Sequence, residues 1–208
     1  MRALDRRALL CVAASACVAA LARGDDTTDV LRAIAAARSK LATLSARFTQ
    51  VRALSLFAST VTSQGELTLV RPDRLRWELF EPDAVVYWVG PEGIAYKTKS
   101  GSGKVAPGDA GALGAVLGDL LVVLGGDLEK LRDRYAIDAT RSAEGARVTA
   151  TPRDEKLKKL VARLTLDLAP NLVAPKRFEL LESGEDKATI TFEAARLDEK
   201  IDPQKMRP

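Results

Sequence analysis

The sequence predicts a mainly β, α+β fold in which short strands form one antiparallel sheet. Strand-like stretches recur between residues 46 and 98 and again between residues 135 and 192. Proline-containing turns separate the earlier stretches, and the interior of a strand rarely tolerates proline. Clear helical periodicity is found near the N-terminus instead. Short strands joined by tight turns are typical of an antiparallel meander.

The N-terminus has the pattern of a secretory signal peptide. Arg2, Arg6 and Arg7 precede an uncharged run of 15 residues, Ala8–Ala22, which ends in the small-residue pattern Ala20-Leu21-Ala22. The run is shorter than the roughly 20 residues that cross a bilayer, so cleavage fits better than a membrane span. We therefore predict a signal peptide over residues 1–22, and a single exported domain over residues 23–208.

Both cysteines of the chain, Cys11 and Cys17, lie inside this predicted signal peptide. Cleavage after Ala22 would remove them, and with them any disulfide or thiolate chemistry. An alternative stays open, because Ala14-Ser15-Ala16-Cys17 is a loose version of the lipobox. In that case Cys17 would be lipidated and would anchor the protein to a membrane.

The charge of the predicted mature chain is modest and mixed. Without the three arginines and the one aspartate of the signal segment, 29 basic and 27 acidic residues remain, a net charge of +2. Basic and acidic residues are mixed along the chain, so no basic patch that would bind nucleic acid is expected.

The pattern along the mature chain predicts one helix followed by strands. N-capping residues open a helix over Thr27–Leu44, where Leu31 and Ile34 begin the helical spacing. The predicted strands are Ala46–Ala53, Thr60–Val70, Leu75–Phe80, Val85–Val89, Ile94–Thr98, Tyr135–Thr140, Arg147–Thr151, Leu160–Leu168, Lys176–Leu181 and Ala188–Phe192. The Gly-rich stretch Gly101–Gly114 is expected to interrupt the sheet, and its first residues, Gly101–Lys104, to form a flexible connection. Leu113–Leu124 is interpreted as an apolar covering segment, and Lys156–Lys159 as a polar turn or a lead-in to the next strand.

Residues suited to catalysis are scarce. The sequence has no histidine, and the predicted mature chain has no cysteine, which removes the commonest general base and the best zinc ligands. Gly101-Ser102-Gly103-Lys104 lacks the rest of a phosphate-binding loop. We therefore predict a protein that is not an enzyme and that has no cofactor and no metal.

Aromatic and aliphatic residues point instead to an apolar ligand. Trp77, Tyr87, Trp88 and Tyr96 fall on three successive predicted strands. Leu67 and Leu69 share one face of their strand, as do Trp77 and Leu79, because side chains alternate along a strand. An ordinary hydrophobic core would show the same pattern, so the residues alone leave both interpretations open.

Several short motifs follow one another between residues 44 and 96: Leu44-Ser45-Ala46-Arg47-Phe48-Thr49-Gln50, Gln64-Gly65-Glu66-Leu67, Arg71-Pro72, Arg76-Trp77, Glu81-Pro82 and Gly93-Ile94-Ala95-Tyr96. In their order and spacing these motifs resemble the LolA family of periplasmic lipoprotein carriers. Weaker matches at Thr151-Pro152, Leu160–Leu168 and Arg177-Phe178-Glu179 extend the resemblance over nearly the whole mature chain.

The resemblance implies an unclosed antiparallel half-barrel whose concave apolar face is covered by helices. It implies that Arg71 helps to hold the covering segment. The residues expected at the cavity and its cover are Leu67, Leu69, Arg71, Trp77, Leu79, Trp88, Tyr96, Leu117, Leu120, Leu121 and Leu124.

The function that the resemblance implies is that of a monomeric carrier. It would shield the acyl chains of lipoproteins between an inner-membrane release transporter and an outer-membrane acceptor. Two other functions stay open: a lipid- or lipoprotein-sensing module of envelope stress, and a lipid-anchored acceptor. The short segment after Phe192 and the glycine-rich stretch depart from the family pattern, which also fits a different cargo such as a glycolipid.

Overall fold

The computed structural model describes residues 26–57, 59–106, 111–125 and 127–208. Within these ranges twelve strands form one antiparallel sheet in the order β6-β5-β4-β3-β2-β1-β11-β10-β9-β8-β7, and β12 pairs with β1 beside β11. Two meanders, β1–β6 and β7–β11, are therefore joined by the pairing of β1 with β11. The sheet is not closed, because β6 and β7 stand at opposite ends of this order.

The strands are short, with two longer strands at the start of the chain. They are β1 (Thr43–Leu54), β2 (Ser59–Val70), β3 (Arg74–Leu79), β4 (Val85–Gly90), β5 (Gly93–Thr98), β6 (Gly101–Val105), β7 (Tyr135–Ser142), β8 (Gly145–Pro152), β9 (Val161–Leu168), β10 (Pro175–Glu182), β11 (Lys187–Phe192) and β12 (Arg196–Leu197). Their boundaries confirm the mainly β, unclosed fold predicted from the sequence.

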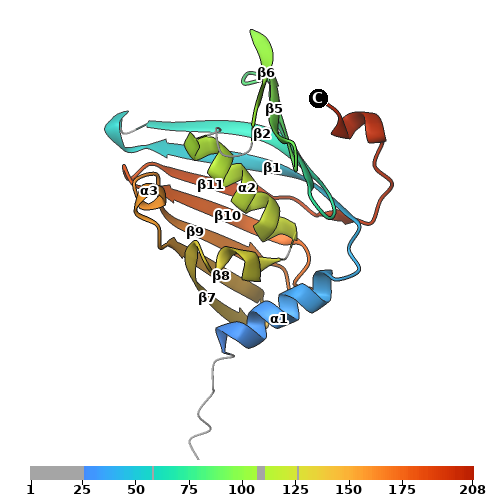
Figure 1. Cartoon of the computed structure of the whole chain (residues 1–208), viewed down its shortest axis with the longest axis vertical. Helices are drawn as coiled ribbons and strands as arrows, with labels where there is room; N and C mark the ends of the chain where they lie inside the picture. Colours follow the sequence, from blue (N-terminus) through green and yellow to red (C-terminus); the bar gives the residue numbers. More distant parts are fainter. Residues whose placement is uncertain (1–25, 58, 107–110, 126) are drawn as a thin grey trace, which may run out of the picture.

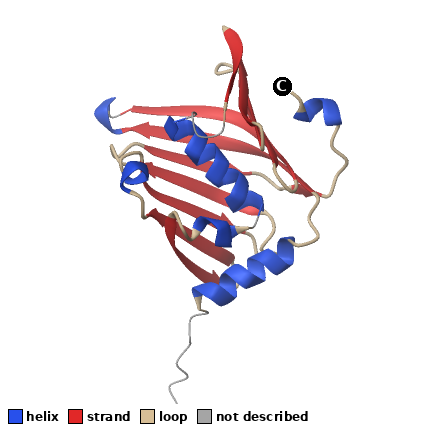
Figure 2. Cartoon of the chain, in the orientation of Figure 1, coloured by secondary structure: helices blue, strands red, loops and turns tan. Residues whose placement is uncertain are grey.

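The helices do not all lie on the same side of the sheet. They are α1 (Thr27–Arg38), α2 (Gly111–Gly125), α3 (Glu155–Lys158) and the short 3-10 helices η1 (Ser55–Phe57), η2 (Leu128–Leu131) and η3 (Pro203–Met206). The helix α2 covers the concave face of the sheet, whereas η3 lies on its convex face. Figures 1 and 2 show α2 running across the curved sheet, whereas α1 packs against β7. The side chain of Thr27 binds this edge strand, since its hydroxyl accepts from the backbone N–H of Ala139 over 3.1 Å.

Cross-strand register separates an apolar concave face from a polar convex face. Leu67, Trp77, Tyr87 and Tyr96 pair in one row across β2, β3, β4 and β5, so their side chains emerge on the same side. The ring centroids of Phe48 and Trp77 are 4.2 Å apart on this face. The face is therefore the wall of the core, and α2 lies over it.

A glycine makes the close ring packing on this face possible. Gly65 pairs with Phe48 on one side and with Leu79 on the other. A Cβ at this position would lie 2.4 Å from Cζ of Phe48 and 2.1 Å from the carbonyl oxygen of Glu78. The glycine in the motif Gln64-Gly65-Glu66-Leu67 is thus explained by the space that the Phe48 ring needs.

The C-terminal residues fold back over the convex face. Lys205 in η3 forms an ion pair with Glu66 of β2, and its carbonyl accepts from Nε1 of Trp88 over 3.0 Å. Arg196 binds the other carboxylate oxygen of Glu66 over 2.8 Å. Burial acts to raise the pKa of Glu66, but these two cations, together with Arg76, outweigh it and lower the pKa. The segment after β11 is therefore part of the folded structure.

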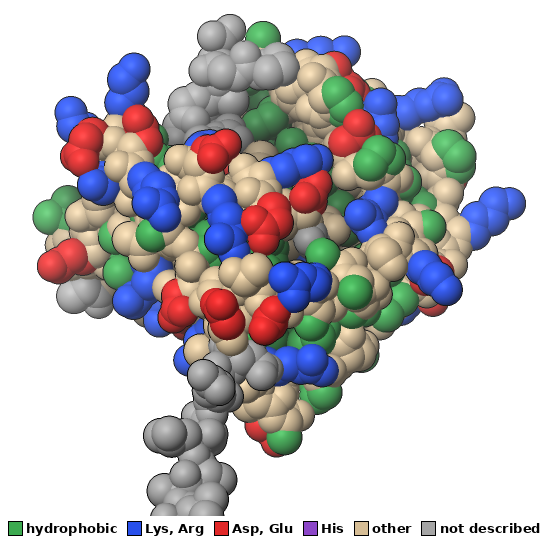
Figure 3. All heavy atoms as spheres, turned by 60° about the horizontal axis from the view of Figure 1, so that its bottom comes forward, with side chains coloured by type: hydrophobic (Ala, Val, Ile, Leu, Met, Phe, Trp, Pro, Cys, Tyr) green, Lys and Arg blue, Asp and Glu red, His purple; other side chains and the backbone are tan. Residues whose placement is uncertain are grey.

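Acidic and basic side chains are intermixed on the surface seen in Figure 3. One ion pair of this kind joins two neighbouring strands, because Nε of Arg147 lies 2.6 Å from Asp167. The face shown in Figure 3 thus has the mixed charge that the sequence indicated.

Three sequence predictions need correction. The first helix ends at Arg38, and Leu44 lies in β1, because a turn at residues 39–40 separates the two elements. The stretch Gly101–Val105 is a strand, in which Gly103 lies against the ring of Tyr96. Residues 155–158 form a helical turn capped by Asp154, whose carboxylate accepts from Lys156 N and Leu157 N.

The predicted signal peptide, with Cys11 and Cys17, lies outside the described residues. Among the helices of the described residues, none has the length and apolar character that a membrane crossing requires.

Candidate functional site

A cavity of about 450 Å³ lies between the concave face of the sheet and α2. Most of its wall is apolar and comes from β3, β4, α2 and the strands β9–β11. The apolar lining residues are Trp77, Leu79, Tyr87, Leu117, Leu120, Leu160, Val161, Phe178, Leu180, Ala188 and Ile190. A cavity of this size and character suits a small molecule or the hydrocarbon part of a larger one.

One end of the cavity is polar. Gln50 and Arg52 of β1 and Glu182 of β10 complete the lining. Nη2 of Arg52 donates to Oε1 of Glu182 over 2.8 Å, and both side chains are partly exposed. Leu160, which also lines the cavity, is partly exposed as well. The cavity therefore has an apolar interior and a polar, accessible end.

A buried arginine holds the C-terminal end of α2. The side chain of Arg38, which is 1% exposed, donates from Nη1 to the carbonyl oxygens of Val123 and Leu124, each over 2.8 Å. Its Nε and Nη2 donate to the carbonyls of Leu172 and Val173. The last carbonyls of a helix lack partners within the helix and attract cations. Arg38 thus ties α1, α2 and the β9–β10 connection together.

Burial, reinforced by the charge of Arg71, lowers the pKa of Arg38 to about 10. The guanidinium is therefore still cationic at neutral pH. Because its charge faces four carbonyl oxygens rather than a carboxylate, Arg38 acts as a hydrogen-bond donor to the backbone of several elements at once.

A second contact fixes the middle of α2. Asp119 is buried and accepts hydrogen bonds from Nη1 of Arg134, over 2.6 Å, and from the hydroxyl of Tyr135. Burial raises the pKa of Asp119, although the bonds from Tyr135 and Arg134 oppose this change. Burial, together with the carboxylate of Asp119, also raises the pKa of Tyr135. The helix is therefore held at its middle and at its C-terminal end.

Arg71 does not make the helix contact that the family resemblance implied. Its Nη1 donates to the backbone carbonyl of Arg38 instead. Arg38 and not Arg71 reaches the carbonyls of α2. The physical reason is position, because Arg71 lies in the β2–β3 turn, next to the end of α1.

The other predicted residues fall into three groups. Trp77, Leu79, Leu117 and Leu120 line the cavity. A second group belongs to the same apolar side of the sheet but does not line the cavity: Leu67, Leu69, Leu121, Leu124 and Tyr96. Trp88 needs correction, because it pairs with Arg76 and therefore faces the opposite side of the sheet from Trp77.

The sequence reasoning missed the contributions of β1, β10 and β11. Phe178 and Leu180, and likewise Ala188 and Ile190, alternate with outward-facing residues, and this period of two could have indicated a shared face. No comparable signal marks Arg38.

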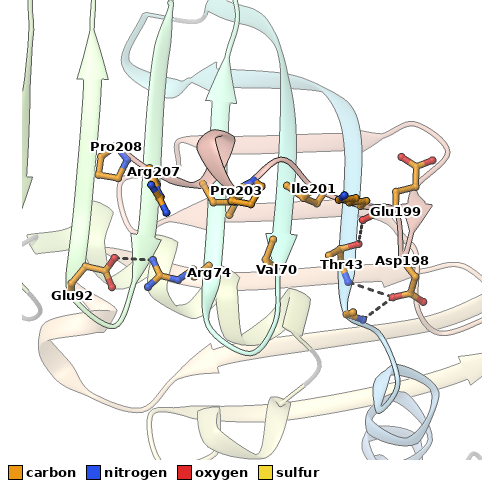
Figure 4. Close-up of a pocket in the computed structure, with 13 residues that line it drawn as sticks. Thr43, Val70, Arg74, Glu92, Asp198, Glu199, Ile201, Pro203, Arg207 and Pro208 are labelled. Atoms are coloured by element: carbon orange, nitrogen blue, oxygen red, sulfur yellow. Dashed lines mark hydrogen bonds and ion pairs between the residues drawn. The ribbon is translucent and has the colours of Figure 1, made fainter.

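A second pocket, of about 760 Å³, lies on the convex face beside the C-terminal residues (Figure 4). Polar interactions surround it: Arg74 donates to Glu92 over 2.9 Å, and Asp198 accepts from the backbone N–H of Ala42 over 2.7 Å. Val70 and Ile201 supply part of its apolar surface. None of the predicted site residues lines this pocket, whereas four of them line the apolar cavity under α2, so the cavity under α2 is the better candidate site.

Within the described residues, no group of three or more acidic side chains is arranged to hold a metal ion. The lining of the candidate site consists of apolar side chains, the ion pair of Arg52 with Glu182, the amide of Gln50 and the phenol of Tyr87.

Together, the open antiparallel sheet, the helix across its concave face and the apolar cavity define an unclosed half-barrel with an apolar interior. Residues 39–87 match the family model described as outer membrane lipoprotein carrier protein LolA. The resemblance noted in the sequence is thereby confirmed for this part of the chain. No curated protein sequence matches the chain.

Solved structures with a similar arrangement have low sequence identity to this chain. A LolA superfamily protein from Nitrosomonas europaea is 7% identical, with a TM-score of 0.48 over 88% of this chain and 98% of that one. MucB in complex with MucA(peri) is 16% identical, with a TM-score of 0.45 over 88% of this chain, which spans 60% of the MucB chain. The lipoprotein LppX from Mycobacterium tuberculosis is 9% identical, with a TM-score of 0.44 over 84% of this chain and 98% of that one.

Proposed function

We propose that this protein is a periplasmic carrier that shields the acyl chains of a lipoprotein, or of a related lipid, on the way to the outer membrane. The observation that carries the proposal is the apolar cavity under α2, with its polar end. An acyl chain inside it would be removed from water, which contributes about 0.8 kcal/mol for each buried methylene. No bond is made or broken in this function, and it requires neither cofactor nor metal.

The two anchors of α2 support a cover that opens reversibly. The contacts of Arg38 and Asp119 hold α2 at its middle and at its C-terminal end, and Leu117 and Leu120 of the same helix line the cavity. A carrier needs a cover that shields the empty cavity and yields to cargo. In the cell, an inner-membrane transporter would supply the cargo and an outer-membrane acceptor would take it, with the carrier acting as a monomer.

The test uses the protein's own fluorescence. The chain has two tryptophans; Trp77 lines the cavity and Trp88 lies on the opposite face. A Trp88→Phe variant therefore reports on the cavity, and a Trp77→Phe variant is the matched control. We expect a synthetic lipopeptide to change the emission of Trp77 and to displace a fluorescent fatty-acid probe, with little change in Trp88. An unchanged probe signal at saturating lipopeptide would refute the carrier function.

A lipid-anchored acceptor would have the same cavity but a different N-terminus. Mass spectrometry of the processed protein distinguishes the two, because cleavage after Ala22 leaves an unmodified N-terminus, whereas an anchored form begins at an acylated Cys17.

A further inference from the structure

The concave face changes from apolar to polar at the same level on two strands. On β1, the inward-facing residues Leu44, Ala46 and Phe48 are followed by Gln50 and Arg52. On β10, Phe178 and Leu180 are followed by Glu182. Both strands run antiparallel to β11, where Ala188 pairs with Arg52 on one side and with Leu180 on the other. The polar residues therefore meet at one end of the cavity.

The charges at this end balance. Arg52 and Glu182 are the only acidic or basic side chains among the described residues of the lining, and they form an ion pair of 2.8 Å. The nearest turn adds Asp186, whose carboxylate accepts from the backbone N–H and the hydroxyl of Ser55. An anionic head group would thus meet an arginine that is already paired, with two carboxylates close by.

Hydrogen-bonding capacity remains even though the charges are paired. A guanidinium has five N–H donors, and one of those of Arg52 binds Glu182. Gln50 adds an amide with both donor and acceptor atoms. Glu182 has a second carboxylate oxygen that can accept.

We infer that this end of the cavity selects an uncharged head group that carries both a donor and an acceptor, such as a primary amide, over a free carboxylate. An amide carbonyl can accept from Arg52 or Gln50, and its N–H can donate to Glu182, with the ion pair left intact. A carboxylate has to compete with Glu182 for Arg52 and is repelled by it, because like charges in a site cost binding energy. The inference rests on the proposed function and names its preferred head group.

The test compares two ligands that differ in one group. N-dodecanoylglycinamide and N-dodecanoylglycine share the acyl chain and the first amide, and only the second has a carboxylate. Dissociation constants are measured by titration calorimetry below the micellar concentration of each ligand. We expect the wild-type protein to bind the glycinamide about tenfold more tightly.

Charge variants then test the cause of the preference. Glu182→Gln frees Arg52, so the carboxylate ligand should bind at least as well as the amide. Arg52→Gln leaves Glu182 unpaired and should increase the preference for the amide. Asp167→Asn is the matched control, because it breaks a cross-strand ion pair with Arg147 away from the cavity, and its ratio should equal that of the wild type.

The outcomes separate the inference from the function on which it rests. A wild-type preference for the carboxylate, or a ratio that Glu182→Gln leaves unchanged, would overturn the head-group inference while binding itself supports the carrier. If neither ligand binds to any variant, both the carrier function and the inference are refuted.

Discussion

Replacing Arg38 by leucine should release α2 from the sheet. The variant loses the two hydrogen bonds from Nη1 to the carbonyls of Val123 and Leu124, each 2.8 Å long. Bonds to a charged group contribute about 1.5–3 kcal/mol each, so their loss weakens the closed position of α2 by about 3–6 kcal/mol. Because 1.4 kcal/mol corresponds to about a factor of ten, opening of α2 should become at least about 100-fold more frequent.

The whole protein should also become less stable. The carbonyls of Leu172 and Val173 lose their partner as well, and each buried acceptor left without a partner costs about 1–3 kcal/mol. Domains of this size are stable by about 5–15 kcal/mol, so the variant should still fold at 25 °C.

Hydrogen exchange followed by mass spectrometry measures both effects. In Arg38→Leu, the amides of α2 should exchange faster by a larger factor than those of β9, and Arg38→Lys should restore part of the protection because it keeps a charged donor. Arg32→Leu is the control on the same helix, since Arg32 is exposed and binds only Asp29 among its described contacts. Equal acceleration in α2 and β9 would show that Arg38 stabilises the fold as a whole and has no specific hold on α2.

Three further predictions follow from individual contacts. Gly65→Ala should destabilise the protein by about 1–3 kcal/mol through overpacking, whereas Gly101→Ala, which has open space around it, should have little effect on the urea midpoint. Burial raises the pKa of Asp119, so the folded state binds this proton more tightly than the unfolded state does. The wild type should therefore gain stability relative to Asp119→Asn as the pH falls from 7 toward 4. A relative loss of stability would show that the ion pair with Arg134 has a larger effect on this pKa than burial has. Arg71→Leu should speed exchange in α2 less than Arg38→Leu does, and Arg74→Leu, which breaks a surface pair with a glutamate, should leave it unchanged.

The strands could be predicted because each carries its own pattern. Alternating apolar residues and proline turns determine β2 to β5, which lie within one or two residues of their predicted boundaries. Gly101–Val105 was missed because glycine gives no strand signal. Its strand conformation comes from pairing with β5 and from the Tyr96 ring that lies against Gly103.

The candidate site could be predicted only where it follows local alternation. Local alternation put Trp77 and Leu79 on one face of a single strand, and both line the cavity under α2. The partners of the polar end, Arg52 and Glu182, are 130 residues apart in the sequence, so no local pattern brings them together. Arg38 was missed for the same reason and for a second one, since arginine at the end of a helix is usually solvated.

The displacement of the predicted role from Arg71 to Arg38 has a physical explanation. The last carbonyls of a helix accept hydrogen bonds from any guanidinium that is close enough. A sequence motif identifies an arginine but does not show which carbonyls its side chain can contact. Here Arg71 donates to the backbone carbonyl of Arg38, and the side chain of Arg38 donates to the end of α2. Arg71 therefore acts on α2 through the position of Arg38, and it also lowers the pKa of Arg38 through its charge. If Arg71 acts on α2 only through Arg38, Arg71→Leu in an Arg38→Leu background should add little further opening of α2. The arginine side chain through which Arg71 acts is already absent in that background.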